Sequence, residues 1–76
     1  MKELDFHPHA LYKMAEREIA ADEVIEALQH PDSVMPARLN RQCAYKKRGD
    51  YWLRVIFEET AERILIITTY VSRRRE

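Results

Sequence analysis

The first thirty residues carry apolar side chains every three or four positions, which is the spacing of amphipathic helices. Pro8 suits the first position of a helix, and His30-Pro31 stops the second apolar run. We therefore expect helices at about residues 8–17 and 21–30. The side chains expected to pack against the rest of the protein are Leu11, Met14, Val24, Ile25 and Leu28.

After Pro31 the chain changes to short runs rich in β-branched and aromatic residues that turn signals separate, as strands are. Gly49-Asp50 is a two-residue hairpin signal, and Pro36 suits an edge position. Strands are expected at about residues 34–35, 41–48, 51–58 and 63–71. The predicted fold class is α+β, with two N-terminal helices packed on a four-stranded antiparallel meander sheet in one domain over residues 1–76.

A hairpin closed by Gly49-Asp50 pairs Tyr45 with Arg54, and side chains at paired positions share a face. One face then holds Cys43, Tyr45, Trp52, Arg54 and Ile56, and the other holds Ala44, Lys46, Leu53, Val55 and Phe57. Two short helices cover only one face of such a sheet, so the other is expected to stay partly exposed and to bind protein. The register of the last strand leaves the face of Tyr70 open.

Three polar side chains of the first helix, His9, Lys13 and Arg17, stand four residues apart. Such positions drift by only about 40° per step around a helix axis, so the three share one face. An imidazole moves protons and the two cations bind phosphate, which is the combination that cleavage of an RNA backbone needs. A solvated helix face is the more common alternative.

Composition narrows the class of protein. With 46% apolar and 34% charged residues and a single glycine, the chain is expected to be ordered and globular. Its lone Cys43 forms no internal disulfide, and it shows neither a signal peptide nor an apolar run near the roughly 18 residues of a membrane span. The histidines and Cys43 lack metal-ligand spacing and there is no Gly-rich phosphate loop. We expect a cytoplasmic protein with no metal, no cofactor and no membrane association.

Charge is unevenly distributed although the formal net charge is zero. Residues 1–33 hold three cations and eight anions, whereas residues 34–76 hold ten cations and five anions. If the first part forms helices and the second a sheet, the sheet side is basic and attracts phosphate. A surface balanced for solubility is the alternative, since the sequence pI is near 6.8.

The run His9-Ala-Leu-Tyr-Lys-Met-Ala-Glu-Arg-Glu-Ile19, followed by the apolar runs at 52–57 and 64–70, resembles a family of small bacterial proteins of unassigned function. That family is thought to belong with the RelE/ParE-like toxins of toxin–antitoxin pairs, which it resembles in the order of its elements, and the resemblance spans about residues 4–71. The family usually has glycine where this chain has Glu18, and glutamate would be strained in a left-handed helix end. We therefore expect the first helix to run on by a residue or two.

The resemblance implies a toxin-like component of a bacterial type II toxin–antitoxin pair, with a cognate antitoxin and RNA or the ribosome as partners. It implies a metal-independent endoribonuclease in which the ribose 2′-hydroxyl attacks the phosphate. In RelE-like nucleases, cations and a tyrosine or histidine on the sheet handle that phosphate, and the matching positions are Arg54 and Tyr70. The expected catalytic residues are His9, Arg17, Arg54 and Tyr70, and the expected phosphate-binding residues are Lys13 and Lys46.

Alternatives remain open for both the residues and the protein. Arg54 is also compatible with a carboxylate partner or a wet strand face, Tyr70 with an amphipathic rim position, and Lys46 with a solubilising charge. The protein is also compatible with a non-catalytic module that docks a partner on its sheet face, including a second copy in a homodimer. The placement of the four expected catalytic residues discriminates between these functions. If they line one cleft, the enzyme is favoured, and if the helix stripe and the strand cations lie on opposite sides, the binding module is favoured.

Overall fold

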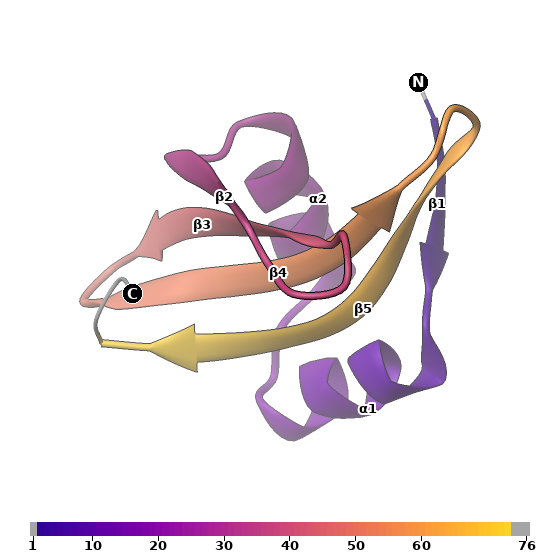
Figure 1. The fold of residues 1–76 in the computed structure, drawn as a ribbon. Helices are drawn as coiled ribbons and strands as arrows, with labels where there is room; N and C mark the ends of the chain where they lie inside the picture. Colours follow the sequence, from indigo (N-terminus) through magenta and orange to yellow (C-terminus); the bar gives the residue numbers. More distant parts are fainter. Residues whose placement is uncertain (1, 74–76) are drawn as a thin grey trace.

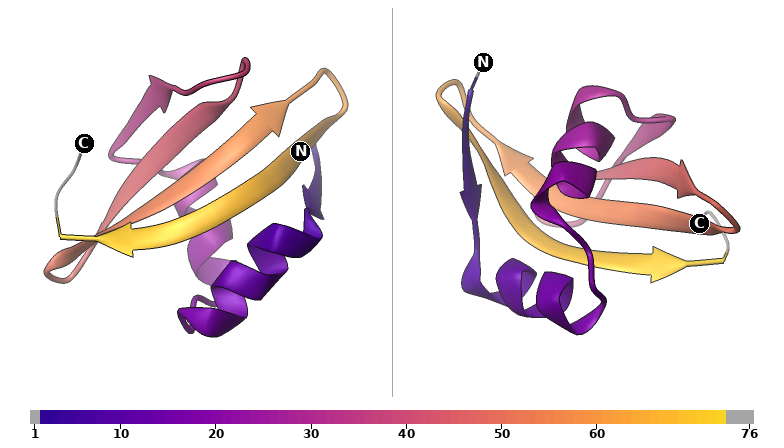
Figure 2. Two further views of the ribbon diagram at one scale, coloured as in Figure 1. Left: turned by 60° about the horizontal axis from the view of Figure 1, so that its bottom comes forward. Right: turned by 180° about the vertical axis from the view of Figure 1, so that it is seen from behind.

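The computed structural model describes residues 2–73, in which one strand is followed by two helices and then four strands. The elements are β1 (Glu3–Phe6), α1 (Pro8–Glu16), α2 (Ala21–Gln29), β2 (Ser33–Pro36), β3 (Gln42–Arg48), β4 (Tyr51–Glu59) and β5 (Arg63–Ser72). The strands form one sheet in the order β1-β5-β4-β3-β2, and both helices lie on the same side of it (Figures 1 and 2). None of the helices in residues 2–73 has the length and apolar character needed to cross a membrane.

The expected four-stranded antiparallel meander is wrong, because the sheet has five strands and is mixed. The additional strand, β1, pairs in parallel with β5, with Leu4 opposite Ile64 and Phe6 opposite Ile66. Only a few residues precede α1, too few for alternation to reveal a strand. The pairing also joins segments about sixty residues apart, so no local pattern reports it.

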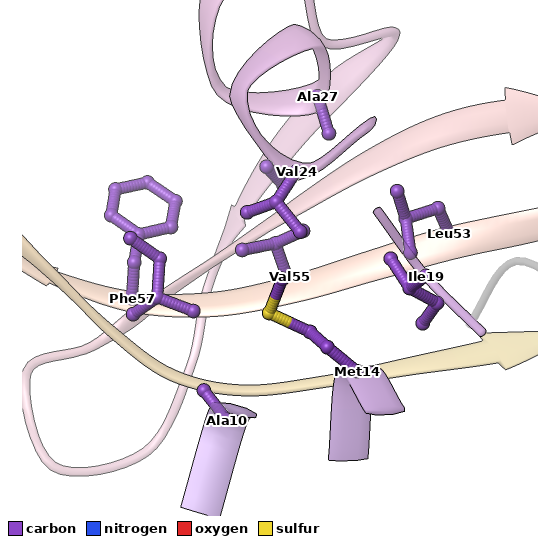
Figure 3. Close-up of a cluster of buried hydrophobic side chains, with 10 residues drawn as sticks. Ala10, Met14, Ile19, Val24, Ala27, Leu53, Val55 and Phe57 are labelled. Atoms are coloured by element: carbon purple, nitrogen blue, oxygen red, sulfur yellow. The ribbon is translucent and has the colours of Figure 1, made fainter. Parts of the chain in front are cut away.

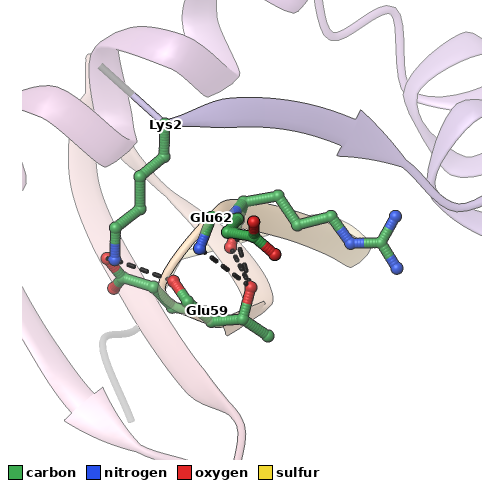
Figure 4. Close-up of polar contacts among 5 residues, drawn as sticks. Lys2, Glu59 and Glu62 are labelled. Carbon is green, nitrogen blue, oxygen red and sulfur yellow. Dashed lines mark hydrogen bonds and ion pairs between the residues drawn. The ribbon is translucent and has the colours of Figure 1, made fainter.

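The N-terminus is tied to the β4–β5 turn by polar contacts (Figure 4). The Lys2 ammonium forms an ion pair with Glu59 and donates to the backbone carbonyl of Thr60 at 2.8 Å. The Thr60 hydroxyl in turn accepts from the backbone N–H of Arg63 at 3.2 Å and closes the turn. Further along β1, the Arg63 guanidinium pairs with Asp5 at 2.8 Å. These contacts hold β1 at the edge of the sheet.

The predicted hairpin register is confirmed: Tyr45 pairs with Arg54, around a turn in which Gly49 has a φ of +61°. On the other side of β4, Arg54 pairs with Tyr70, which places Tyr70 on the same face as Arg54. The β4–β5 register shifts between Ile56 and Phe57, so β5 carries a bulge there.

The core lies between the helices and the sheet (Figure 3). Its buried apolar side chains are Ala10, Met14, Ile19, Val24, Ala27, Ala44, Leu53, Val55, Phe57 and Ile66. Met14 and Val24 were expected there, and Leu28 packs against the cluster while staying partly exposed. The expectation for Leu11 is wrong, because its side chain is 52% exposed and Ala10 is fully buried instead. The phase of α1 puts the small Ala10 against the sheet.

The expected extension of the first helix is wrong, because α1 ends at Glu16. Glu18 adopts a left-handed conformation with a φ of 55°. Its N–H donates to the carbonyl of Ala15 at 3.3 Å, and the N–H of Ile19 donates to the carbonyl of Met14 at 2.8 Å. This pair of hydrogen bonds is the Schellman motif, which normally places glycine at the left-handed position. Burial of Ile19 in the core stabilises this turn and offsets the strain at Glu18.

Candidate functional site

The sheet face that points away from the helices carries a groove of about 570 Å³. Its floor comes from β3, β4 and β5 and includes Cys43, Tyr45, Arg54 and Tyr70. Residues 37–41, which connect β2 to β3, curl over this face and supply the other wall (Figure 1).

Arg54 lies at the centre of this floor between two tyrosines. Its guanidinium carbon is 5.3 Å from the centroid of the Tyr45 ring and 4.9 Å from that of the Tyr70 ring. One guanidinium nitrogen also donates to the Tyr45 hydroxyl at 3.5 Å. The three residues come from neighbouring strands in register, so the sheet itself positions them. Ring faces attract a cation, and these contacts hold the guanidinium in place.

The electrostatics of the floor fix its charge states. Burial, together with the hydrogen bond to Cys43, raises the pKa of Tyr45 above its ordinary value. Burial acts to lower the pKa of Arg54, but its hydrogen bond with Cys43 and its attraction to Tyr45 and Tyr70 outweigh this, and the net pKa is raised. At neutral pH the floor therefore presents a fixed positive charge beside a neutral phenol.

Apolar side chains line the groove beside Arg54. Ile56 comes from β4, and the bulge in β5 lets two consecutive residues, Ile67 and Thr68, face the groove. On the rim, Arg41 pairs with Glu58 at 3.2 Å, while Arg38 and Leu39 form the tip of the β2–β3 connection. The floor of the groove thus combines the charge of Arg54 with neighbouring apolar side chains.

The stripe on α1 is present but does not reach this groove. His9 is exposed on the helix, which packs against the other face of β5. Lys13 and Arg17 both lie close to the carboxylate of Glu16, at 3.4 Å and 3.8 Å. Arg17 also lines a separate hollow of about 400 Å³ with Arg48 and Tyr51. Of the four residues expected to be catalytic, the structure brings together Arg54 and Tyr70 only.

Lys46 also lies away from the groove, on the helix side of β3. Its ammonium donates to the backbone carbonyl of His30 at 2.8 Å and is 3.8 Å from the carboxylate of Glu26. A cation at the end of α2 satisfies a terminal carbonyl and complements the helix dipole. The geometry of Lys46 is that of a helix cap.

Sequence reasoning gave no role to several groove residues. The hairpin register placed Tyr45 on the correct face, and its position opposite Arg54 is the signal that could have identified it. The rim residues Arg38, Leu39 and Arg41 had no such signal, because their placement depends on how the β2–β3 connection folds over the sheet.

The groove is suited to binding an anion. Among the residues that line it in the described part of the chain, there is neither a histidine nor a carboxylate, and its proton-bearing groups are phenols, a threonine hydroxyl and a thiol. Over residues 2–73, no three His, Cys, Asp or Glu side chains come together as a metal-binding group. Charge stabilisation and hydrogen bonding to an anion are therefore the chemistry that the described groove residues supply.

No curated protein and no solved structure matches this chain. A family model described as a domain of unknown function, DUF4258, matches residues 6–71. The match includes both helices, β2, β3, β4 and all of β5 except its last residue. The chain belongs to the DUF4258 family.

Proposed function

We propose that this protein is the toxin-like component of a bacterial type II toxin–antitoxin pair and that its groove binds the phosphodiester backbone of RNA. The observation that carries the proposal is the Arg54 guanidinium, held between the rings of Tyr45 and Tyr70 at the floor of an open groove. A phosphate there meets a preorganised cation together with hydroxyl donors. The cognate antitoxin is proposed to cover the same face.

The position of Arg54 makes its charge effective. The side chain is only partly exposed, and a charge in such a site is screened less by salt than one on an open surface. Arg38 and Arg41 add positive charge on the opposite wall, although Glu58 offsets that of Arg41. The groove thus offers cations on two sides of a bound backbone.

The proposed reaction is metal-independent cleavage of the RNA backbone. The ribose 2′-oxygen attacks phosphorus, a P–O2′ bond forms and the P–O5′ bond breaks, which leaves a 2′,3′-cyclic phosphate and a 5′-hydroxyl. The 2′-hydroxyl passes its proton to solvent water, and the leaving O5′ gains a proton from the Tyr70 hydroxyl, which solvent then reprotonates. Arg54 stabilises the additional phosphate charge, and the Tyr70 hydroxyl transfers a proton.

A second candidate function is a non-catalytic module that docks a partner on the open sheet face. It is favoured by a specific observation: His9 and Arg17 do not line the groove with Arg54, so the convergence expected of an active site is incomplete. In this case the partner is the antitoxin or a second copy of the chain.

The test is incubation of the purified protein with 5′-labelled single-stranded RNA in EDTA, with filter binding and end-group analysis as readouts. Arg54→Ala is expected to bind RNA more weakly and to lose cleavage. Tyr70→Phe keeps the ring beside Arg54 and is expected to bind RNA while cleaving about 10²–10⁴-fold more slowly. His9→Ala is the matched control on α1 and is expected to retain both activities.

Each outcome bears on a different part of the proposal. Loss of cleavage in a folded His9→Ala variant would contradict a mechanism centred on the groove. Binding without cleavage by the wild type would leave RNA binding standing and refute the nuclease. If the wild type binds no RNA even at low salt, the docking module replaces the proposal.

A further inference from the structure

The tip of the β2–β3 connection has an unusual backbone. Leu39 and Asn40 have φ values of 60° and 61°, and the N–H of Arg41 donates to the carbonyl of Arg38 at 3.2 Å. A turn with two successive positive φ values and this hydrogen bond is of type I′. Asn40 tolerates the left-handed conformation, but a leucine does not adopt it readily because its Cβ approaches the backbone. Leu39 therefore strains the turn.

Burial does not explain the leucine. Its side chain is 76% exposed, the largest exposed fraction given for a large apolar residue among residues 2–73. A residue that is both strained and exposed contributes neither turn propensity nor core packing to the monomer. Asparagine or glycine would suit the position better on both counts.

The surroundings of Leu39 show what its side chain can contact. It stands on the wall of the groove, whose lining also includes Ile56 and Ile67 from the sheet. These aliphatic groups line the same hollow as the Arg54 guanidinium. The pattern matches a nucleotide, which joins an anionic phosphate to a flat apolar base face.

We infer that Leu39 is a substrate-contact residue that packs against the face of a nucleobase whose phosphate is bound at Arg54. This inference rests on the proposed RNA-binding function and names its substrate class: single-stranded, unstacked RNA. A base within a duplex is covered on both faces by its neighbours, so its face is not open to a side chain. The strain at Leu39 is retained because an apolar group is needed at the rim.

The test compares Leu39→Asn, which relieves the strain and removes the apolar group, with Leu39→Met, which keeps an apolar side chain. Thermal unfolding and fluorescence anisotropy with a labelled single-stranded oligoribonucleotide are measured for both. Leu39→Asn is expected to raise the thermal midpoint by several degrees. It is also expected to weaken RNA binding by about fivefold, the lower end of the range for loss of one aromatic stacking contact with a base, because leucine is aliphatic. Leu39→Met is expected to bind RNA within about threefold of the wild type.

Arg54→Ala and a double-stranded RNA of the same sequence complete the experiment. If Leu39→Asn binds RNA as tightly as the wild type while Arg54→Ala binds more weakly, the inference is overturned and the proposed function stands. Equal affinity of the wild type for the duplex also overturns it. If wild type and variants all fail to bind either RNA, the proposed function itself has failed.

Discussion

Thr69 lies in the middle of β5 with its side chain completely buried on the helix side of the sheet. Its hydroxyl oxygen makes no hydrogen bond with the described part of the chain. A buried hydroxyl without a partner loses its hydrogen bonds to water and forms none in the protein, which costs about 1–3 kcal/mol of stability. The position is therefore a weak point in an otherwise apolar core.

Thr69→Val is expected to increase the free energy of unfolding by about 1 kcal/mol, because valine has the same shape and no polar atom to desolvate. Urea denaturation monitored by circular dichroism measures the change. Thr68→Val, one residue earlier and on the groove face, is the control and should alter stability little. A loss of stability in Thr69→Val would show that the hydroxyl has a hydrogen-bond partner in solution.

Tyr45 predicts a pH dependence. Burial raises the pKa of the Tyr45 phenol in the folded state above the unfolded value near 10. The neutral phenol therefore contributes its full share to the free energy of unfolding below about pH 10, and this contribution is lost as the pH rises through the folded-state pKa. Absorbance at the phenolate band should reveal a late-titrating tyrosine together with falling stability at alkaline pH. Tyr45→Phe should remove this late step and Tyr12→Phe should leave it in place. A titration in which Tyr45→Phe changes nothing contradicts the assignment.

At the scale of an element, the end of α1 is held by a left-handed glutamate at position 18. The helix stops there because the chain must turn to bury Ile19, and that gain exceeds the steric cost at Glu18. Local preference and tertiary packing therefore disagree at this residue, and packing prevails.

Glu18→Gly is expected to stabilise the protein by about 0.5–1 kcal/mol. Glycine removes the steric cost of the left-handed conformation, about 1–2 kcal/mol, but the greater conformational entropy of the unfolded chain cancels part of this gain. The thermal midpoint measures the gain. Glu18→Ala removes the same charge but keeps a Cβ, so no comparable gain is expected from it. Equal midpoints for the two variants would attribute any effect to the charge instead of the backbone.

At the scale of the whole molecule, the excess of cations in the second half of the chain does not all reach the groove. Arg48 pairs with Glu23 of α2 at 2.6 Å, and Lys46 lies near Glu26. These β3 cations neutralise the acidic helix that covers them. The basic character of the open face therefore rests on a smaller set, with Arg54 at its centre.

The salt dependence of RNA binding tests whether Arg54, and not the cations outside the groove, contacts RNA phosphate. The slope of log affinity against log salt for single strands changes by about 0.7 for each phosphate contact. Arg54→Ala should reduce the slope by about that amount, whereas Arg17→Ala, in the separate hollow, should leave it unchanged. Equal effects of the two substitutions would place the RNA across both regions.

Local signals in the sequence determined the helices and most of the strands. Apolar spacing, together with Pro8 and His30-Pro31, placed both helices within a residue of their observed bounds, apart from the extension expected of the first helix. The Gly49-Asp50 turn set the β3–β4 register and with it the pairing of Tyr45 with Arg54. These features depend on neighbours along the chain, so the sequence by itself was sufficient for them.

Only the tertiary structure decided the rest, because it depends on residues that are distant in sequence. The parallel pairing of β1 with β5 joins the two ends of the chain, and the burial of Ala10 in place of Leu11 depends on how close α1 lies to that strand. His9 and Arg54 are separated because they lie on opposite sides of the sheet. Leu39 reaches the rim of the groove because the β2–β3 connection folds back over the sheet. No local pattern encodes any of these, since each arises from packing between elements.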